Sequence, residues 1–280
     1  MKIPEWINVK PYDKKSYLKI KNLLEKYKIN TVCIEANCPN RYECFSKGKA
    51  TFMILGDVCT RNCLYCNIKK GLPKPVDRSE PKRIANLVKK MKLNYAVITC
   101  VTRDDLEDGG ANQFIKVVEE IRKLNHNCKI ELLISDLNGN WKALEKIVFA
   151  KPDVINHNIE VVEELFPKLR PKGSYERSLE LLKKIKEIDS NIKTKSGFMV
   201  GLGESKKQII KTLKDLKNAR CDIVTIGQYL QPSHVHYSVK KYYTTKEFQK
   251  IKEIAEKIGF EKVFAGPLVR SSYRAEEIFG

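Results

Sequence analysis

Short apolar runs recur along the chain from residue 51 to residue 265. They are rich in β-branched residues and nearly continuous, a pattern typical of parallel strands that are buried on both faces. The expected strands are Thr51–Leu55, Tyr95–Val101, Lys129–Ser135, Val154–His157, Lys195–Val200, Ile223–Leu230 and Val263–Ala265.

Between these runs, apolar residues recur at the three- and four-residue spacing of amphipathic helices. The helical positions are Phe114, Val117, Val118, Ile121 and Leu124; Leu181, Leu182, Ile185 and Ile188; Ile209, Ile210, Leu213 and Leu216; and Phe248, Ile251, Ile254, Ala255 and Ile258. Gly259 follows the last set in C-cap position. Alternating strands and helices predict the α/β class with six or seven βα units, and therefore a partial (β/α)6-type TIM-like barrel with its chemistry at the carboxyl ends of the strands.

The first 50 residues break this rhythm. One amphipathic helix, with Ile20, Leu23, Leu24 and Tyr27 on one face, leads into a cysteine-bearing loop before the first strand. We interpret this segment as a cap over the barrel mouth. The predicted organisation is an N-terminal cysteine-bearing cap over residues 1–50, a barrel over residues 51–265 and a C-terminal extension over residues 266–280.

Charge and hydropathy narrow the class of protein further. The 280 residues include 53 Lys and Arg against 34 Asp and Glu, for a formal net charge of +19. A positive surface suits an acidic partner, which could be nucleic acid, a carrier protein or an electron donor. The basic residues are spread along the chain, so a lysine-rich composition explains the charge equally well. No apolar stretch approaches the roughly 18 residues of a membrane span, and no signal-peptide pattern is present, so we expect a cytoplasmic protein without a membrane partner.

Cysteine content points to metal binding. Six of the nine cysteines fall between residues 33 and 66, a density that disulfide-bonded secreted domains reach only in much shorter chains. Cys100, Cys128 and Cys221 lie in apolar stretches and are expected to be small buried residues.

Cys59, Cys63 and Cys66 form a C-x3-C-x2-C run just after the first expected strand. Three thiolates can hold an iron-sulfur cubane and leave one iron without a protein ligand, which is a site for chemistry. A zinc knuckle is the alternative, but structural zinc sites usually have four protein ligands. The spacing resembles the radical S-adenosylmethionine superfamily, and Tyr65, the aromatic residue before the third cysteine, matches it too.

A second triad, Cys33-x4-Cys38-x5-Cys44, lies in the cap. It indicates a second cluster site, although zinc binding or redox-active thiols also fit this spacing. Only fourteen residues separate the two triads.

With both triads in this order, the sequence resembles the lipoyl synthase family over nearly its whole length. The further matching segments are Val101-Thr-Arg-Asp-Asp-Leu-Glu-Asp-Gly-Gly110, His157-Asn-Ile-Glu160, Leu169-Arg-Pro171, Thr194-Lys-Ser-Gly197, Gly201-Leu-Gly-Glu204, Thr225-Ile-Gly-Gln-Tyr229 and Gly266-Pro-Leu-Val-Arg-Ser-Ser-Tyr273. The chain departs from the family at His236-Tyr-Ser-Val239, usually His-Leu-Pro-Val, and at Gln231, where a basic residue is common. Both departures concern details of substrate recognition.

The resemblance implies insertion of two sulfur atoms, at carbons 6 and 8 of an octanoyl chain that is linked to a lysine of a lipoyl carrier domain. It implies two [4Fe-4S] clusters and two molecules of S-adenosylmethionine for each lipoyl group. In the family the auxiliary cluster of the first triad takes a further ligand from a serine that matches Ser272, so that the extension closes on this cluster. The implied partners are octanoylated carrier domains of 2-oxoacid dehydrogenase E2 subunits and glycine cleavage H protein, a ferredoxin or flavodoxin donor, and an iron-sulfur carrier that rebuilds the consumed cluster.

Polar residues at the expected strand ends suit S-adenosylmethionine. Asn158 and Glu160 follow the fourth strand, where a carboxylate can accept hydrogen bonds from ribose hydroxyls, and Arg170 can meet the methionine carboxylate. The turn with Gly109 and Gly110 resembles the segment that approaches the methionine amino group. Each residue could instead serve as a helix cap, a surface ion pair or a plain turn.

Two rival functions remain. A tRNA methylthiotransferase is also a two-cluster radical enzyme, and the net charge would suit RNA, but such enzymes carry a distant cysteine domain and a C-terminal RNA-binding barrel. A non-enzymatic metal-dependent nucleic-acid-binding module would not need six or seven βα units. We therefore expect no nucleic-acid partner. We assign no histidine to metal, and His126 and His234 are expected to be solvated.

Overall fold

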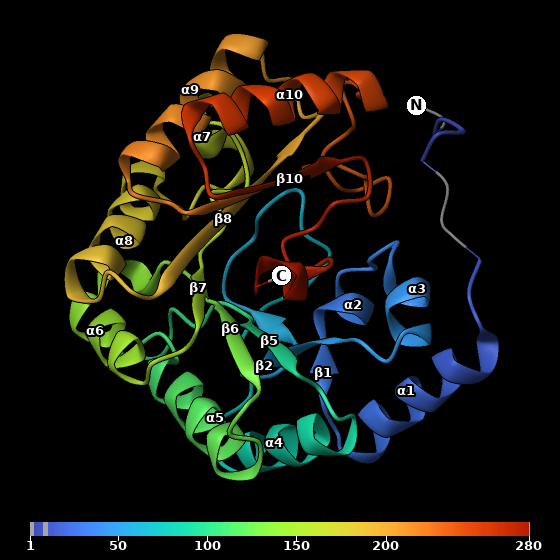
Figure 1. The fold of residues 1–280 in the computed structure, drawn as a ribbon, viewed down its shortest axis with the longest axis vertical. Coiled ribbons are helices and arrows are strands. Elements are labelled where there is room, and N and C mark those ends of the chain that lie inside the picture. The colour runs from blue at the N-terminus through green and yellow to red at the C-terminus, as the bar shows by residue number, and fades with distance from the viewer. Residues whose placement is uncertain (1–2, 8–10, 280) are drawn as a thin grey trace.

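The computed structural model describes residues 3–7 and 11–279, and a curved sheet of eight strands lies at its centre (Figure 1). The order along the sheet is β1, β2, β5, β6, β7, β8, β9, β10, in which β1 is antiparallel to β2 and all later neighbours are parallel. The strand bounds are β1 Asn30–Thr31, β2 Thr51–Ile54, β5 Tyr95–Cys100, β6 Lys129–Leu133, β7 Val154–Asn156, β8 Lys193–Val200, β9 Ile223–Gln228 and β10 Lys262–Gly266. Among the described residues β1 and β10 do not pair with each other, so the barrel is partial, as predicted.

Six helices connect successive parallel strands and cover the outside of the sheet (Figure 1). They are α4 Glu80–Lys90, α5 Ala111–Leu124, α6 Trp141–Phe149, α8 Tyr175–Ile188, α9 Lys206–Asn218 and α10 Thr245–Ile258. Four of the predicted helices correspond to α5, α8, α9 and α10, the fifth lies in the first 50 residues, and all seven predicted strands agree with the structure to within two residues at each end. Within the described residues, no helix is both long and apolar enough to cross a membrane.

The shorter elements lie in the connections. A separate two-stranded parallel pair, β3 Val58–Cys59 and β4 Lys69–Lys70, brackets the second half of the cysteine-rich region. The helix α7, Phe166–Leu169, follows β7, and 3-10 turns occupy Leu137–Gly139, Glu163–Leu165 and Ala275–Phe279.

Continuous apolar strands produce two buried clusters, one between β2, β5, β6 and α4 to α6, the other between β8, β9, α9 and α10. Helix ends follow the sequence signals. Thr244 and Glu247 form a reciprocal capping box at the start of α10, and Gly259 ends the helix with φ +98°, a left-handed conformation that favours glycine. The predicted C-cap is therefore confirmed.

The cap contains three helices, α1 Lys14–Lys26, α2 Val32–Glu35 and α3 Arg41–Ser46, with α1 against α3. We expected a cysteine-bearing loop here, and that expectation is wrong for two of its cysteines: Cys33 lies in α2 and Cys44 in α3. The hydroxyl of Thr31 caps α2 by accepting a hydrogen bond from the Cys33 amide. Helices of four and six residues are too short to show an apolar period in the sequence.

After β10 the chain turns back into the gap between β10 and the cap, and its 3-10 turn at Ala275–Phe279 lies near the middle of the ring in Figure 1. The Asn40 side chain of the cap donates a hydrogen bond of 2.6 Å to the Leu268 carbonyl. The Tyr273 hydroxyl lies 3.2 Å from a carboxylate oxygen of Glu43, and Lys49 forms an ion pair with Glu276. Residues 267–279, which we call the tail, thus contact the cap repeatedly.

Candidate active site

The C-x3-C-x2-C run begins at Cys59, the last residue of β3, and continues along the connection to β4. The Thr60 amide donates to the Thr102 carbonyl, just past the end of β5, at 3.1 Å, and the Gly71 amide donates to the Cys59 carbonyl at 3.1 Å. The Leu64 amide donates to the Leu169 carbonyl at 3.0 Å. These bonds hold the run against the carboxyl ends of the parallel strands, where the fold class places its chemistry.

A cavity of about 560 Å³ opens at these strand ends. Five of the six clustered cysteines line it, together with four of the other predicted site residues and the serine pair of the tail. The residues in question are Cys33, Cys38, Cys59, Cys63, Cys66, Tyr65, Asn158, Glu160, Arg170, Ser271 and Ser272. Segments from the cap, the barrel and the tail therefore meet around one space.

The cap triad is held by short-range backbone bonds. The Cys38 amide donates to the Cys33 carbonyl at 3.0 Å, and the Cys44 amide donates to the Asn40 carbonyl at 2.9 Å. Burial, followed by the neighbouring Cys33 and Cys38, raises the pKa of Cys44 to about 12. Burial and Cys33 also raise the pKa of Cys38, which Arg270 opposes. The thiols of this triad are thus close enough to affect one another's ionisation, although Cys44 does not line the cavity.

Two thiols of the second triad, Cys63 and Cys66, behave in the same way. Burial raises the pKa of Cys66 to about 12, and burial also raises the pKa of Cys63, against the effect of Arg170. Thiols with such pKa values stay protonated at neutral pH unless a cation displaces the proton, as iron does. In the part of the chain that the structure describes, no three His, Cys, Asp or Glu side chains converge in the arrangement of a bound metal ion. The donor chemistry nevertheless fits iron-sulfur clusters, because each triad offers soft sulfur donors on one short segment.

Buried polar residues from the segment that follows β7 form another wall of the cavity. The Asn158 amide donates to the Glu160 carboxylate at 3.0 Å, and Arg170 donates to the Asn158 carbonyl at 3.0 Å. Burial raises the pKa of Glu160, and the positive charge of Arg170 partly offsets this increase. The Asn158 side-chain oxygen is buried and has no hydrogen-bond partner within the described residues. An unpartnered buried acceptor beside a carboxylate suits a ligand that carries hydroxyl groups.

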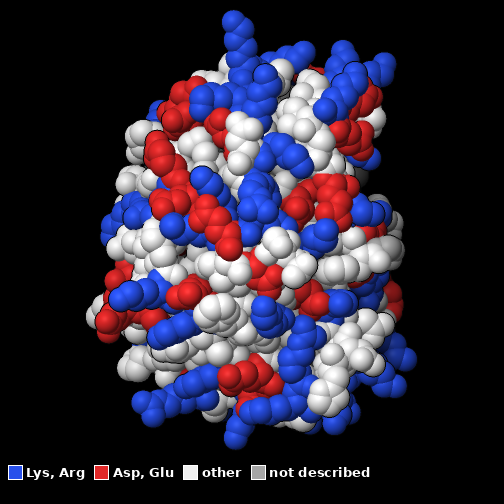
Figure 2. Space-filling view, turned by 60° about the vertical axis from the view of Figure 1, so that its left-hand side comes forward, with Lys and Arg blue, Asp and Glu red and all other residues white. Residues whose placement is uncertain are grey.

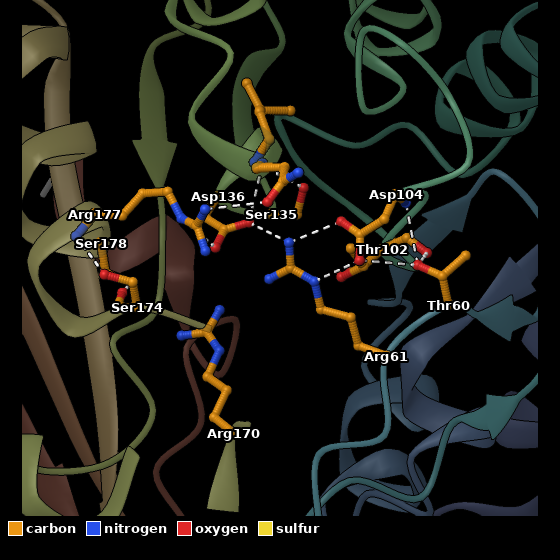
Figure 3. Close-up of polar contacts among 12 residues, drawn as sticks. Thr60, Arg61, Thr102, Asp104, Ser135, Asp136, Arg170, Ser174, Arg177 and Ser178 are labelled. Carbon is orange, nitrogen blue, oxygen red and sulfur yellow. Dashed lines mark hydrogen bonds and ion pairs between the residues drawn. The ribbon is translucent and has the colours of Figure 1, made fainter. Parts of the chain in front are cut away.

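Arg61, inside the cysteine run, belongs to a buried ionic network that the sequence analysis missed (Figure 3). Its guanidinium donates to Asp104 at 2.8 Å and to Asp136 at 2.6 Å, and Arg177 donates to Asp136 at 3.1 Å. Burial alone would raise the pKa of Asp136, but Arg61 and the other nearby positive groups hold it below its usual range. The position of Asp136 just after β6 was the available signal.

Two predicted residues lie elsewhere. Gly109 and Gly110 do not line the cavity: they form the turn into α5, where Asp108 accepts hydrogen bonds from the Gly110 and Asn112 amides. A Cβ at Gly110 would stand 2.2 Å from a methyl carbon of Leu55, so close packing accounts for this glycine. At this end of the sheet the cavity is lined instead by residues 99–102 of β5 and its continuation.

The remaining cysteines and histidines follow most expectations. Cys128 and Cys221 are buried, while Cys100 is half-buried and lines the cavity. His126 and His234 are exposed, as predicted. His157 is buried, and its Nδ1 lies 2.9 Å from the Ile134 carbonyl.

Residues 53–216 match the family model of the Radical SAM superfamily. Among solved structures, the chain has a TM-score of 0.57 to methylornithine synthase (PylB), at 13% identity over 95% of this chain and 82% of that one. It has the same TM-score to Streptococcus suis SuiB bound to S-adenosylmethionine, at 15% identity over 81% of this chain and 54% of that one. The fold and the matched segment define a radical S-adenosylmethionine enzyme.

Full-length relatives make the assignment narrower. The chain is 53% identical to "Lipoyl synthase" of Caldicellulosiruptor saccharolyticus, over 99% of this chain and 97% of that protein. It is 52% identical to "Lipoyl synthase" of Alkaliphilus metalliredigens, over 98% and 94% of the two chains. The chain belongs to the lipoyl synthase family.

Proposed function

We propose that this chain inserts sulfur at carbons 6 and 8 of an octanoyl group that is carried on a lysine of a lipoyl carrier protein. The observation that supports this most directly is the meeting of both cysteine triads and Ser272 around one cavity, in a chain whose full-length relatives are lipoyl synthases. A reaction that removes hydrogen and adds sulfur at the same carbon needs both functions within reach of one substrate chain.

The residues divide into two ligand sets. Cys59, Cys63 and Cys66 hold one [4Fe-4S] cluster with an open iron. Cys33, Cys38 and Cys44, with Ser272, hold the auxiliary cluster. When bound, these groups and S-adenosylmethionine supply one-electron hydrogen abstraction and a source of sulfur, chemistry that side chains alone do not provide.

The polar wall of the cavity binds S-adenosylmethionine in this proposal. Glu160 and the free Asn158 oxygen accept hydrogen bonds from ribose hydroxyls, and Arg170 faces the methionine carboxylate. Tyr65, within the cysteine run, lines the same cavity and contributes to this binding site. For Gly109 and Gly110 we retain only an indirect role, in which their turn shapes the strand end that precedes them.

Partners follow from the reaction. We propose octanoylated domains of 2-oxoacid dehydrogenase E2 subunits and glycine cleavage H protein as substrates, ferredoxin or flavodoxin as the electron donor, and an iron-sulfur carrier that rebuilds the auxiliary cluster. We place the protein in the cytoplasm, where such carriers act. Neither a membrane nor a nucleic acid has a part in this reaction.

The test is an anaerobic assay of the reconstituted and reduced chain. It should bind about eight irons, as two cubane clusters require. Incubation with S-adenosylmethionine and an octanoyl-lysine peptide should yield 5′-deoxyadenosine and a peptide heavier by two sulfurs as the reduced dithiol, or by two sulfurs less two hydrogens once the dithiol has been oxidised to the ring disulfide. Binding of about four irons, stoichiometric zinc, or thiolation of tRNA with no conversion of the peptide would overturn the proposal.

A further inference from the structure

The tail crosses the end of β9 at a point where only a glycine fits. A Cβ built at Gly227 would stand 2.2 Å from the Val269 carbonyl oxygen and 3.1 Å from a terminal guanidinium nitrogen of Arg270. The nearer atom belongs to the backbone, so a side chain at position 227 would have to displace the tail itself. Glycine within a strand marks such close approach of a second backbone. β9 therefore provides a seat for the tail.

Hydrogen bonds fasten the tail on both sides of this seat. On the cap side, Asn40 donates to the Leu268 carbonyl at 2.6 Å. On the barrel side, the Asn158 amide donates to the Ser271 hydroxyl at 2.6 Å. The contact at Gly227 lies between these two bonds along the tail, and Ser272 is the next residue after the second bond.

Ser271 and Ser272 thus have different surroundings although they are adjacent. The Ser271 hydroxyl is engaged by Asn158, which belongs to the proposed S-adenosylmethionine wall. Ser272 lines the same cavity as Cys33 and Cys38, and no side-chain hydrogen bond of Ser272 is found within the described residues. The Ser271 hydroxyl is already hydrogen-bonded to the barrel, which leaves the Ser272 hydroxyl available to the cap triad.

We propose that Gly227 and Ser271 are positioning residues for Ser272. Because Gly227 has no side chain, the tail backbone can pack against β9. The hydrogen bond between Asn158 and Ser271 then fixes the direction in which Ser272 faces the cap cysteines. This inference rests on the proposed function, because Ser272 acts there as a ligand of the auxiliary cluster. It assigns to the barrel a direct part in completing a ligand set that otherwise comes from the two ends of the chain.

The first experiment isolates the auxiliary cluster. In a chain with Cys59, Cys63 and Cys66 all replaced by Ala, about four irons remain, as one cubane requires. In that background we expect Gly227→Ala and Ser271→Ala to speed the loss of iron to a chelator by about fivefold to tenfold, the effect of roughly one lost hydrogen bond. Ser271→Thr keeps the hydroxyl and should restore slow loss.

The matched control is Gly266→Ala, at the end of β10 just before the tail. A Cβ there would meet only a methyl group of Val269, at 3.3 Å, so iron loss should stay within about twofold of the parent. In the full chain, Gly227→Ala and Ser271→Ala should still cleave S-adenosylmethionine to 5′-deoxyadenosine but form less lipoyl product for each molecule cleaved.

The outcomes separate this inference from the proposed function. If Gly227→Ala and Ser271→Ala lose iron at the parent rate and couple cleavage to sulfur insertion as the parent does, the seat has no positioning role. Should Gly227→Ala fail to fold, the comparison of Ser271→Ala with Ser271→Thr decides alone. If the unsubstituted chain binds no auxiliary cluster or inserts no sulfur, the proposed function itself is wrong.

Discussion

His157 shows how strongly the cavity wall controls a single ionisable group. Its ring is 1% exposed, and Nδ1 faces the Ile134 carbonyl at 2.9 Å, so the neutral ring carries its proton on this nitrogen. Burial, and after it Arg170, lowers the pKa of His157 to about 4. The ring is therefore neutral in the folded chain at every pH at which the enzyme would work.

This shift predicts a pH-dependent stability. Below the ordinary pKa of histidine, His157 is protonated in the unfolded chain but stays neutral in the folded chain. The free energy of unfolding therefore falls as the pH falls. Between pH 7.5 and 5.5 we expect His157 to contribute a loss of about 1.4 kcal/mol in the free energy of unfolding. Urea unfolding of the parent and of His157→Gln at both pH values measures the difference, and equal slopes for the two proteins would contradict it.

At the residue scale, the sequence revealed functional side chains that can be recognised from their spacing along the chain. The cysteine triads are recognisable because three soft ligands stand on one short segment, and five of these six cysteines line the cavity. Arg61 gave no such signal. Its partners Asp104 and Asp136 lie 43 and 75 residues away, and only the fold brings them together.

Among the elements, the connection from β3 to β4 is held by contacts between residues that are far apart in the sequence. Arg61 joins it to the segment after β5 through Asp104 and to the end of β6 through Asp136, and Arg177 of α8 completes the network (Figure 3). The side chain of Asp136 is 0% exposed, so its charge depends on these two arginines.

Arg61→Ala tests this link. It leaves Asp136 buried with Arg177 as its one remaining cation in the described network, and we expect the free energy of unfolding to fall by about 3 kcal/mol. The control is Lys69→Ala, which breaks an exposed ion pair between the start of β4 and Asp57, just before β3, and should cost less than about 1 kcal/mol. Urea unfolding followed by circular dichroism compares the two, and similar losses would show that the buried network does not stabilise the fold.

Elements with a long apolar period were predicted well and short ones were not. α10 has five apolar positions, a capping box and a terminal glycine, so several signals agree. α2 and α3, which carry Cys33 and Cys44, contain too few residues for any period to appear. They form because Thr31 caps the first of them and because β1 and the tail fix the segment from outside.

For the molecule as a whole, the positive charge is distributed over the surface. On the face shown in Figure 2, Lys and Arg side chains are interspersed with Asp and Glu, although the basic residues predominate. Such a surface attracts an acidic protein from a distance without defining one contact, and salt weakens that attraction.

The positive surface predicts that an acidic carrier protein and an uncharged peptide respond differently to salt. Raising the KCl concentration from about 50 mM to about 300 mM shortens the Debye length roughly 2.5-fold and should raise the KM for an acidic octanoylated carrier domain severalfold. The KM for a short uncharged octanoyl-lysine peptide should change by less than about twofold. Equal responses in steady-state assays would show that the net charge does not steer the carrier.

The partial barrel was predictable because each buried strand is marked in the sequence by a continuous apolar run. The position of the tail in the opening of this barrel was not predictable. The tail contains no regular element before Ala275, and single contacts hold it to distant residues such as Asn40, Asn158 and Gly227. Only the family resemblance connected Ser272 with the cap cysteines. The structure adds the contacts that bring the backbone of the tail against the cap.

The raised pKa values of the clustered thiols have a practical consequence for the chain before it receives iron. Alkylating reagents and disulfide exchange attack the thiolate, and the pKa values of Cys38, Cys44, Cys63 and Cys66 keep these side chains protonated at neutral pH. The folded chain without iron therefore keeps these four thiols poorly reactive toward alkylating reagents and disulfides, which preserves them for the metal.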